Sequence, residues 1–154
     1  MTQPSKPIPN IGTLHTCHPE QMEWLAWAMP GAHFKLLHAD AASGCFTLLI
    51  KFEPGAQAPI HRHLGAVQGY MLEGGFHYHG EPERPFNAGC YLWEDDGAVH
   101  QPVSPNGAVM FAVFHGAVEG LDEDGNVTGR VNWKWHVDKW NAAGNHYQPT
   151  GSKI

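Results

Sequence analysis

Short runs of alternating apolar and polar residues follow one another through most of the chain. Side chains on a β-strand point to opposite faces in turn, so this alternation predicts strands with one buried face. Gly, Pro, Asn and Asp separate the runs at short intervals, which is typical of β-sandwiches and barrels. The expected strands are 34–38, 45–52, a strand carrying His61 and His63, 68–72, 76–79, 90–93, 99–103, 108–115 and 127–131. Strands 68–72 and 76–79 are expected to form a hairpin around Glu73-Gly74-Gly75.

Two segments depart from the strand pattern. Residues 20–28 could form a short helix, but Pro30-Gly31 ends the segment abruptly, and we favour an extended arm. Near the C-terminus, Trp133, Val137 and Trp140 recur at helical spacing and predict a short helix within 133–143. We therefore expect a flexible lead-in over 1–18, a barrel with its arm and helix over 19–145, and a tail over 146–154.

Composition narrows the class of protein. The chain has 154 residues, 18 of them Gly and 12 Pro, with only 16% charged residues, which suits one domain of short strands. The net charge is −6 and no cluster of Lys and Arg occurs, so nucleic acid is not an expected partner. No apolar run approaches the roughly 18 residues that span a membrane, so no membrane association is expected. Three widely spaced cysteines argue against a disulfide framework, and we expect a cytoplasmic protein.

The aromatic residues on the expected strands are candidates for the core. Buried aromatic rings contribute much of the apolar area of a small barrel. We expect six of them to fill the barrel: Phe46, Phe52, Tyr70, Phe76, Phe111 and Phe114. The remaining strand edges and six Trp residues favour a homodimer or a homotetramer.

The first candidate for chemistry is the pair His61 and His63. Residues separated by one position share a face of a strand, and neutral imidazole binds first-row transition metals well. His100 ends a second glycine-punctuated segment and is the expected third ligand. A second alternating pair, His77 and His79, is expected at a hairpin end facing water. The group His15, Cys17 and His18 lies in the Pro-rich lead-in and is not expected to form a zinc site.

Two motifs then resemble a known superfamily. The segment Gly55-x5-His61-x-His63-x4-Gln68-x6-Gly75 resembles the first cupin motif, with Gln68 where most cupins carry a metal-binding Glu. The segment Gly89-x7-Gly97-x2-His100 resembles the second motif, with Asp95 where Pro is usual and Ser104 where Asn is usual. The resemblance implies an all-β, single-domain cupin, a double-stranded β-helix or jelly-roll barrel.

Within the cupins, residues 94–100 and 122–127 resemble a narrower group. These are the three-histidine Fe(II) dioxygenases that cleave acetylacetone or 2,4′-dihydroxyacetophenone, together with the related anti-sigma-factor cupins. The resemblance maps the metal ligands to His61, His63 and His100 and places the carboxylate of Glu94 near the metal. It implies Fe(II) as cofactor, although Zn or Ni could occupy the purified protein. It also implies a small ketone and dioxygen as partners.

A metal site with no carboxylate among its ligands leaves the charge of a divalent cation uncompensated, which favours an anionic, bidentate oxygen ligand. Glu94 is the candidate catalytic base; alternatively it hydrogen-bonds and orients a metal-binding histidine ring, or it is itself a metal ligand. Gln68 could ligate weakly or hydrogen-bond a metal-bound molecule. Tyr70, Trp93 and Phe114 are the expected pocket residues. Two other functions stay open: a non-enzymatic metal or ligand sensor, and a metal-assisted sugar isomerase or epimerase.

Overall fold

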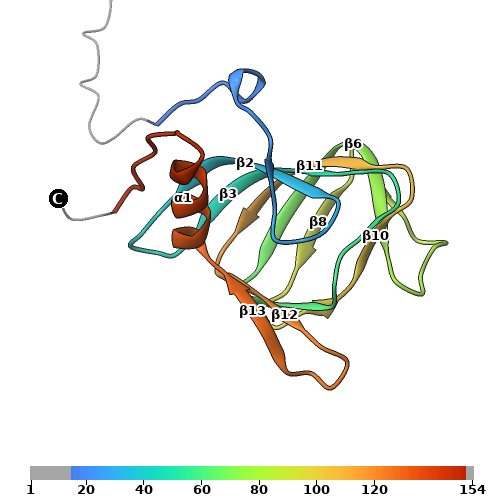
Figure 1. The fold of residues 1–154 in the computed structure, drawn as a ribbon. Coiled ribbons are helices and arrows are strands. Elements are labelled where there is room, and N and C mark those ends of the chain that lie inside the picture. The colour runs from blue at the N-terminus through green and yellow to red at the C-terminus, as the bar shows by residue number, and fades with distance from the viewer. Residues whose placement is uncertain (1–14, 152–154) are drawn as a thin grey trace, which may run out of the picture.

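Strands are the main secondary structure of the computed structural model, which describes residues 15–151, and they form two sheets that face each other (Figure 1). The elements in chain order are η1 (Pro19–Gln21), β1 (Leu25–Ala26), β2 (Ala32–Ala39), β3 (Phe46–Phe52), β4 (Ala56–Gln57), β5 (His61–Leu64), β6 (Val67–Tyr78), β7 (Phe86–Asn87), β8 (Tyr91–Glu94), β9 (Val99–His100), β10 (Pro102–Ser104), β11 (Ala108–Phe114), β12 (Ala117–Leu121), β13 (Val127–Val131) and α1 (Trp133–Ala142). The predicted all-β fold with one short C-terminal helix is confirmed. Most of the predicted lead-in, residues 1–14, lies outside the described residues.

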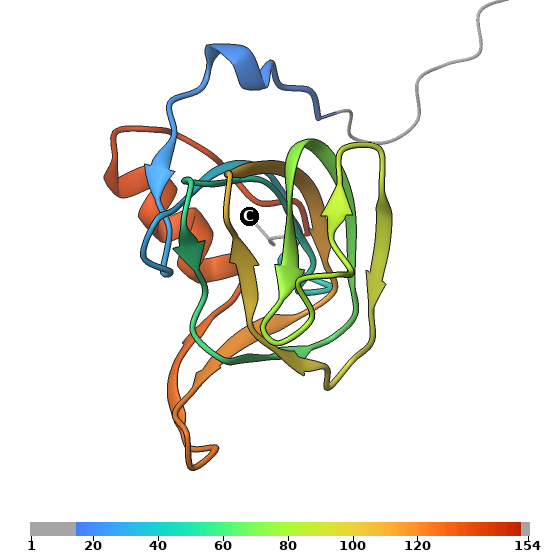
Figure 2. The same cartoon turned by 90° about the vertical axis from the view of Figure 1, so that its right-hand side faces the viewer.

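The two sheets differ in size and in what they carry. The larger has the strand order β1-β2-β3-β11-β6-β10-β4, with β7 and β8 also paired to β6. The smaller has the order β13-β12-β5-β9 and is antiparallel throughout. In Figure 2 the strands curve round a common interior, while the β12–β13 hairpin, in orange, extends away from it. The expected histidine ligands all lie on the smaller sheet.

Strand β6 corrects the predicted hairpin. Residues 67–78 form one continuous strand of 12 residues in place of two strands joined at Glu73-Gly74-Gly75. The glycines bend the strand at the point where its pairing with β11 ends and its pairing with β7 begins. Gly74 has a φ of 61°, and a Cβ there would lie 2.0 Å from the carbonyl oxygen of Gly107. The prediction was wrong because a Gly-Gly pair suits a bend within a strand as well as a turn.

A second correction concerns residues 99–103, which were expected to form one strand. The chain instead leaves the smaller sheet after His100 and joins the larger sheet at Pro102. Strand β12 was not predicted at all. It pairs with β5, and its Val118 and Gly120 stand opposite His63 and His61. The strand that carries two candidate ligands therefore lies between two neighbours, β12 and β9.

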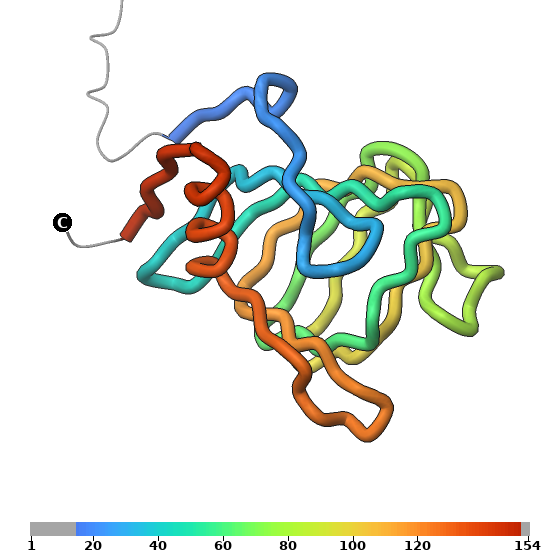
Figure 3. Tube along the Cα trace, in the orientation of Figure 1, coloured from blue at the N-terminus to red at the C-terminus, as the bar shows by residue number. Residues whose placement is uncertain are grey.

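The arm before β2 is extended, as expected, apart from the single turn η1. Figure 3 traces it as the blue segment that joins β2. Its Trp27 is buried in the core, and its Trp24 ring lies beneath two ammonium groups, those of Lys35 at 4.6 Å and Lys51 at 4.9 Å. Lys35 also donates a 2.6 Å hydrogen bond to the carbonyl oxygen of Pro19. These contacts fasten the arm along the larger sheet.

The predicted core aromatics divide between the two faces of the larger sheet. Phe46, Phe52, Phe76 and Phe114 are buried, as expected. Tyr70 and Phe111 were expected inside, but they are 46% and 38% exposed, and they stand opposite each other on the outer face. Successive side chains of β6 and β11 point to opposite faces of the sheet, and these two positions fall on the outer face. The predicted homodimer or homotetramer stays a prediction.

No helix among the described residues combines the length and the apolar character that crossing a bilayer requires.

Candidate metal centre

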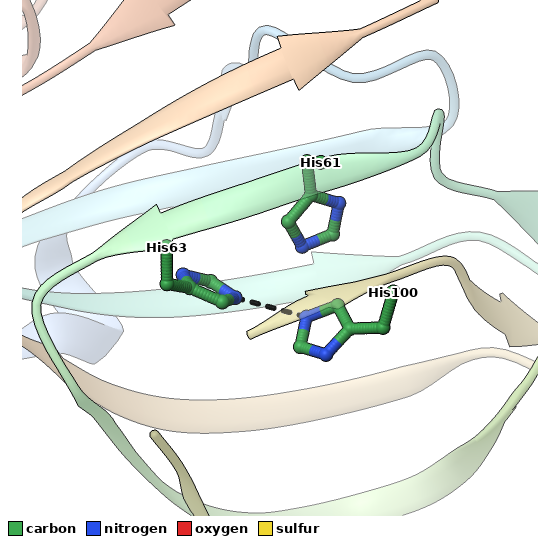
Figure 4. A group of neighbouring side chains, drawn as sticks. All are labelled: His61, His63 and His100. Atoms are coloured by element: carbon green, nitrogen blue, oxygen red, sulfur yellow. Dashed lines mark hydrogen bonds between the residues drawn. The ribbon is translucent and has the colours of Figure 1, made fainter. Parts of the chain in front are cut away.

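The smaller sheet brings the three expected histidines together (Figure 4). His61 and His63 lie on β5 with their side chains buried, because alternate residues of that strand face the interior. His100 lies on β9, directly opposite His61 in the strand register. Figure 4 shows the three rings turned towards one another from these two strands.

The ring nitrogens are spaced as metal ligands would be. One nitrogen of each ring lies within 4.8 Å of those of the other two. The Nε2 atoms of His63 and His100 are 2.9 Å apart. Two imidazole nitrogens at right angles on an ion, each about 2.0–2.1 Å from it, are separated by about 2.9 Å. The residues therefore fit a first-row transition metal, and among the described residues this is the one His/Cys/Asp/Glu group with such convergence.

Burial favours the neutral form, which a metal requires, in two of these imidazoles, those of His61 and His100. Desolvation lowers the pKa of His61 to about 4, although its bond to the Pro59 carbonyl acts in the opposite direction. Desolvation also lowers the pKa of His100, against the attraction of Glu94. The Nδ1–H of His61 donates to the Pro59 oxygen at 3.0 Å. That bond fixes the tautomer and leaves Nε2 free to face the centre of the group.

An ion pair on the outer face fixes the strand that carries His61 and His63. Arg62 lies between them and donates to Glu119 of β12 at 2.5 Å. Arg130 of β13 donates to the other oxygen of the same carboxylate. Glu119 is only 2% exposed, and its two guanidinium partners lower the pKa of its carboxyl group. The three strands are thereby tied in one register behind the histidines.

A buried carboxylate completes the centre. Glu94, at the end of β8, places Oε2 3.0 Å from Nε2 of His63 and 3.6 Å from Nε2 of His100. Its Oε1 accepts a 2.5 Å hydrogen bond from the hydroxyl of Tyr78. Burial raises the pKa of Glu94, but the contacts with His63, His100 and Tyr78 outweigh it, so the group is held as a carboxylate. The larger sheet thus supplies an anion to a histidine cluster on the smaller sheet.

Tyr78 is the residue of the site that sequence reasoning missed. Its ring stacks on His100, with centroids 4.7 Å apart and planes 19° from parallel. Burial, followed by the neighbouring charge of Glu94, raises the pKa of its hydroxyl, so Tyr78 acts as a hydrogen-bond donor. The mistaken hairpin had placed residues 77–79 at a turn facing water. The alternation of Phe76 and Tyr78 on one strand was the pattern that could have found it.

Gln68 does not take the expected position near the metal. On β6 the neighbouring Val67 is buried and lines the cavity, whereas Gln68 stands opposite the outward-facing Trp93. Its assignment as a weak ligand or donor is therefore wrong, because side chains at successive strand positions face opposite sides. An apolar side chain, that of Val67, occupies the inward position.

The cavity at the histidines is small and apolar. It has a volume of about 30 Å³ and is lined by the three histidines, Glu94 and aliphatic and aromatic side chains that include Phe114. Phe114, an expected pocket residue, is therefore among the side chains that line this cavity. Trp93 is 51% exposed on the outer face together with Tyr70, so neither lines the cavity. Both were expected in the pocket, but the structure places them on the opposite face of their strands.

The other histidine groups lie apart from this centre. His77 bonds the backbone oxygen of Tyr78 and His79 is exposed, so the second pair does not converge. His15 contacts the Leu37 carbonyl at 2.9 Å, while His18 lies 3.5 Å from Glu20. Cys17 is exposed, and the three cysteines are free thiols.

Comparisons with known proteins agree with the fold. A model of the ChrR Cupin-like domain family matches residues 13–119, more than half of the chain. The acetylacetone-cleaving enzyme of Acinetobacter johnsonii is 23% identical over 124 residues, which are 78% of this chain and 81% of the enzyme.

Two solved structures extend the comparison. That of an acetylacetone dioxygenase from Acinetobacter johnsonii superposes with a TM-score of 0.73 at 19% identity, covering 92% of this chain and 99% of the other. The anti-sigma protein ChrR, in its complex with SigE of Rhodobacter sphaeroides, gives a TM-score of 0.52 at 21% identity, covering 63% of this chain and 50% of the other. At these identities the likeness establishes the fold alone.

Proposed function

The chain belongs to the ChrR Cupin-like domain family, and from that premise we propose that it is an Fe(II)-dependent dioxygenase. Its substrate is a small β-diketone or α-hydroxyketone, in which it cleaves a carbon–carbon bond. The observation that carries the proposal is the group of three converging histidines with an adjacent carboxylate that already has a hydrogen-bond donor.

The donor set favours an anionic substrate. Three imidazoles carry no charge, so a divalent ion held by His61, His63 and His100 keeps its positive charge for an enolate. When bound there, iron supplies the redox chemistry with dioxygen and the Lewis acidity that favours the enolate. Zinc or nickel could occupy the same nitrogens in the purified protein.

Glu94 is the residue that can remove the substrate proton. Its Oε2 faces the histidine nitrogens, where the substrate oxygens would lie, while its Oε1 is held by Tyr78. A carboxylate held from one side presents the other oxygen as a base. The apolar walls contributed by Val67, Met110 and Phe114 keep water away from this proton transfer.

The acetylacetone-cleaving relative supports this reaction class, and the three-histidine geometry supports it independently of that relative. The test is oxygen uptake after anaerobic loading with Fe(II), measured over a panel of diketones and hydroxyacetophenones. We expect uptake that requires iron and a ketone together. Absence of uptake with every ketone, at one iron per chain, overturns the proposal.

A matched pair of histidine variants makes the test specific to the site. His100→Ala removes a proposed ligand, whereas His79→Ala removes an exposed histidine from the neighbouring β6 segment. We expect His100→Ala to lose bound iron and oxygen uptake, and His79→Ala to keep both. Equal iron content in the two variants would place the metal elsewhere.

The likeness to ChrR favours one second candidate, a sensor that binds metal or ligand without turnover. The same cluster would then bind zinc, and a ketone would bind without consuming oxygen. Stoichiometric zinc binding together with no oxygen uptake by the iron-loaded protein supports this alternative.

A further inference from the structure

A groove of about 330 Å³ lies beside the metal centre and is not explained by the metal ligands. Its walls come from the arm, the hairpin β12–β13 and the helix, and they include Met29, Val118, Gly120, Gly129 and Trp135. His61 lines both this groove and the cavity at the histidines, as do Met29 and Val118. The two spaces are therefore neighbours that share three side chains.

Their volumes imply a division of roles. A space of about 30 Å³ exceeds the roughly 10–15 Å³ that one water molecule needs, but it is far smaller than the cavity of about 150 Å³ that binds benzene. It can receive the chelating oxygens of a ketone but not a substituent the size of a ring. The groove has room for such a substituent, and Met29, an unbranched and flexible side chain, is one of the residues between the two spaces.

Two glycines line the groove next to His61, and one of them, Gly129, leaves open space beside it. Gly120 stands opposite His61 on one side and opposite Gly129 on the other. The inward face of the hairpin therefore has no side chain at these two positions. A Cβ at Gly129 would meet nothing within 4 Å, whereas one at Gly120 would lie 2.8 Å from Oγ1 of Thr128.

The groove suits an apolar group more than a charged one. Ala28, Met29, Val118 and Val131 give it aliphatic walls, and Trp135 adds an aromatic wall. Arg130 is also part of the lining, but its guanidinium is bonded to Glu119 on the outer face of the hairpin. The described part of the lining therefore offers no unpaired cationic side chain to bind an anionic substituent.

We propose that this groove is a substrate subsite that takes an aryl substituent of the ketone, beside Gly129 and against Trp135. The proposal rests on the proposed function, which identifies the metal-binding part of the substrate as a ketone. It selects aryl ketones over acetylacetone as the substrates that use the whole site.

The test compares benzoylacetone, which carries a phenyl ring, with acetylacetone, which does not. Gly129→Leu places a side chain in the open groove, and Gly129→Ala is the milder variant should the larger one fold poorly. Val127→Leu adds apolar bulk on the same strand at an exposed position outside the groove lining, and serves as the control.

Binding to the Zn(II)-loaded protein is measured by calorimetry, which does not depend on turnover, and oxygen uptake is measured separately with iron. We expect Gly129→Leu to weaken benzoylacetone binding by about tenfold or more, with acetylacetone changed by less than about twofold. We expect Gly129→Ala to act in the same direction and Val127→Leu to change neither ligand.

The outcomes separate this proposal from the proposed function. Equal effects of Gly129→Leu on both ketones, or none on benzoylacetone, overturn the subsite even where oxygen uptake is observed. Selective weakening of benzoylacetone binding with no oxygen uptake by the iron-loaded protein supports the subsite and overturns the dioxygenase.

Discussion

At the scale of single residues, the contact between Tyr78 and Glu94 decides which oxygen of the carboxylate is free. The Tyr78 hydroxyl donates a 2.5 Å hydrogen bond to Oε1 of Glu94, so Oε2 is the oxygen that faces His63 and His100. The stacking of the Tyr78 ring on His100 fixes the direction of the hydroxyl. In the proposed reaction Tyr78 is therefore a positioning residue, which would act on the substrate through Glu94.

Tyr78→Phe separates these two roles because it keeps the ring on His100 and removes the donor. A hydrogen bond to a charged group contributes about 1.5–3 kcal/mol, so we expect kcat to fall by about tenfold or more. The KM for the ketone and the iron content should change little, because no proposed ligand is lost. Steady-state kinetics with metal analysis checks this. An unchanged kcat would show that Glu94 needs no donor at Oε1.

At the scale of elements, the sequence predicts those features that have a local cause. The histidines at 61, 63 and 100 follow from spacing, and α1 follows from Trp133, Val137 and Trp140. The long strand β6 did not follow, because its bend at Gly74 depends on the approach of Gly107 from a distant segment. The face of Gln68 was missed for a related reason: which side of a strand is inside depends on the pairing of β6 with β8 and β11.

The bend at Gly74 gives the prediction at this scale. Gly74→Ala puts a side chain at a φ of 61° and against the Gly107 carbonyl oxygen, 2.0 Å from its Cβ. The left-handed conformation alone costs about 1–2 kcal/mol for a residue with a Cβ, and the contact adds to it. We expect the free energy of unfolding to fall by more than about 2 kcal/mol in urea titrations.

Gly129→Ala is the matched control, since Gly129 lies in a strand with a φ outside the left-handed region and an open space at its Cβ. It should change the free energy of unfolding by less than about 1 kcal/mol in either direction. If the two variants proved equally stable, the bend in β6 would not require glycine.

At the scale of the whole molecule, one buried histidine joins the arm, the helix and the larger sheet. His136 of α1 accepts a 2.9 Å hydrogen bond at Nε2 from the Trp27 indole of the arm. Its Nδ1–H donates to the Asn132 carbonyl at 2.6 Å, and its ring stacks on Phe46 of β3 at 4.4 Å. Both nitrogens are thus used in the neutral form, and a proton on Nε2 would face the indole N–H.

This arrangement makes the stability of the fold depend on pH. Burial, helped by the charge of Lys139 and opposed by the bond to Asn132, lowers the pKa of His136 from 6.5 to about 4. The unfolded chain therefore binds the proton first as the pH falls. The stabilisation is complete above pH 6.5 and is lost as the pH falls towards 4, by at most about 3 kcal/mol for this group.

Urea unfolding of the metal-free protein between pH 7 and pH 4.5 checks this expectation against a His136→Gln variant. Glutamine cannot titrate, so the variant should be less stable at pH 7 but should lose less stability on acidification than the natural chain. In both proteins the remaining pH dependence of the free energy of unfolding includes a contribution from His61, whose pKa burial also lowers to about 4. Because that contribution is common to both, the difference between the two slopes belongs to His136. Identical slopes would mean that the link between arm, helix and sheet tolerates the charged imidazole.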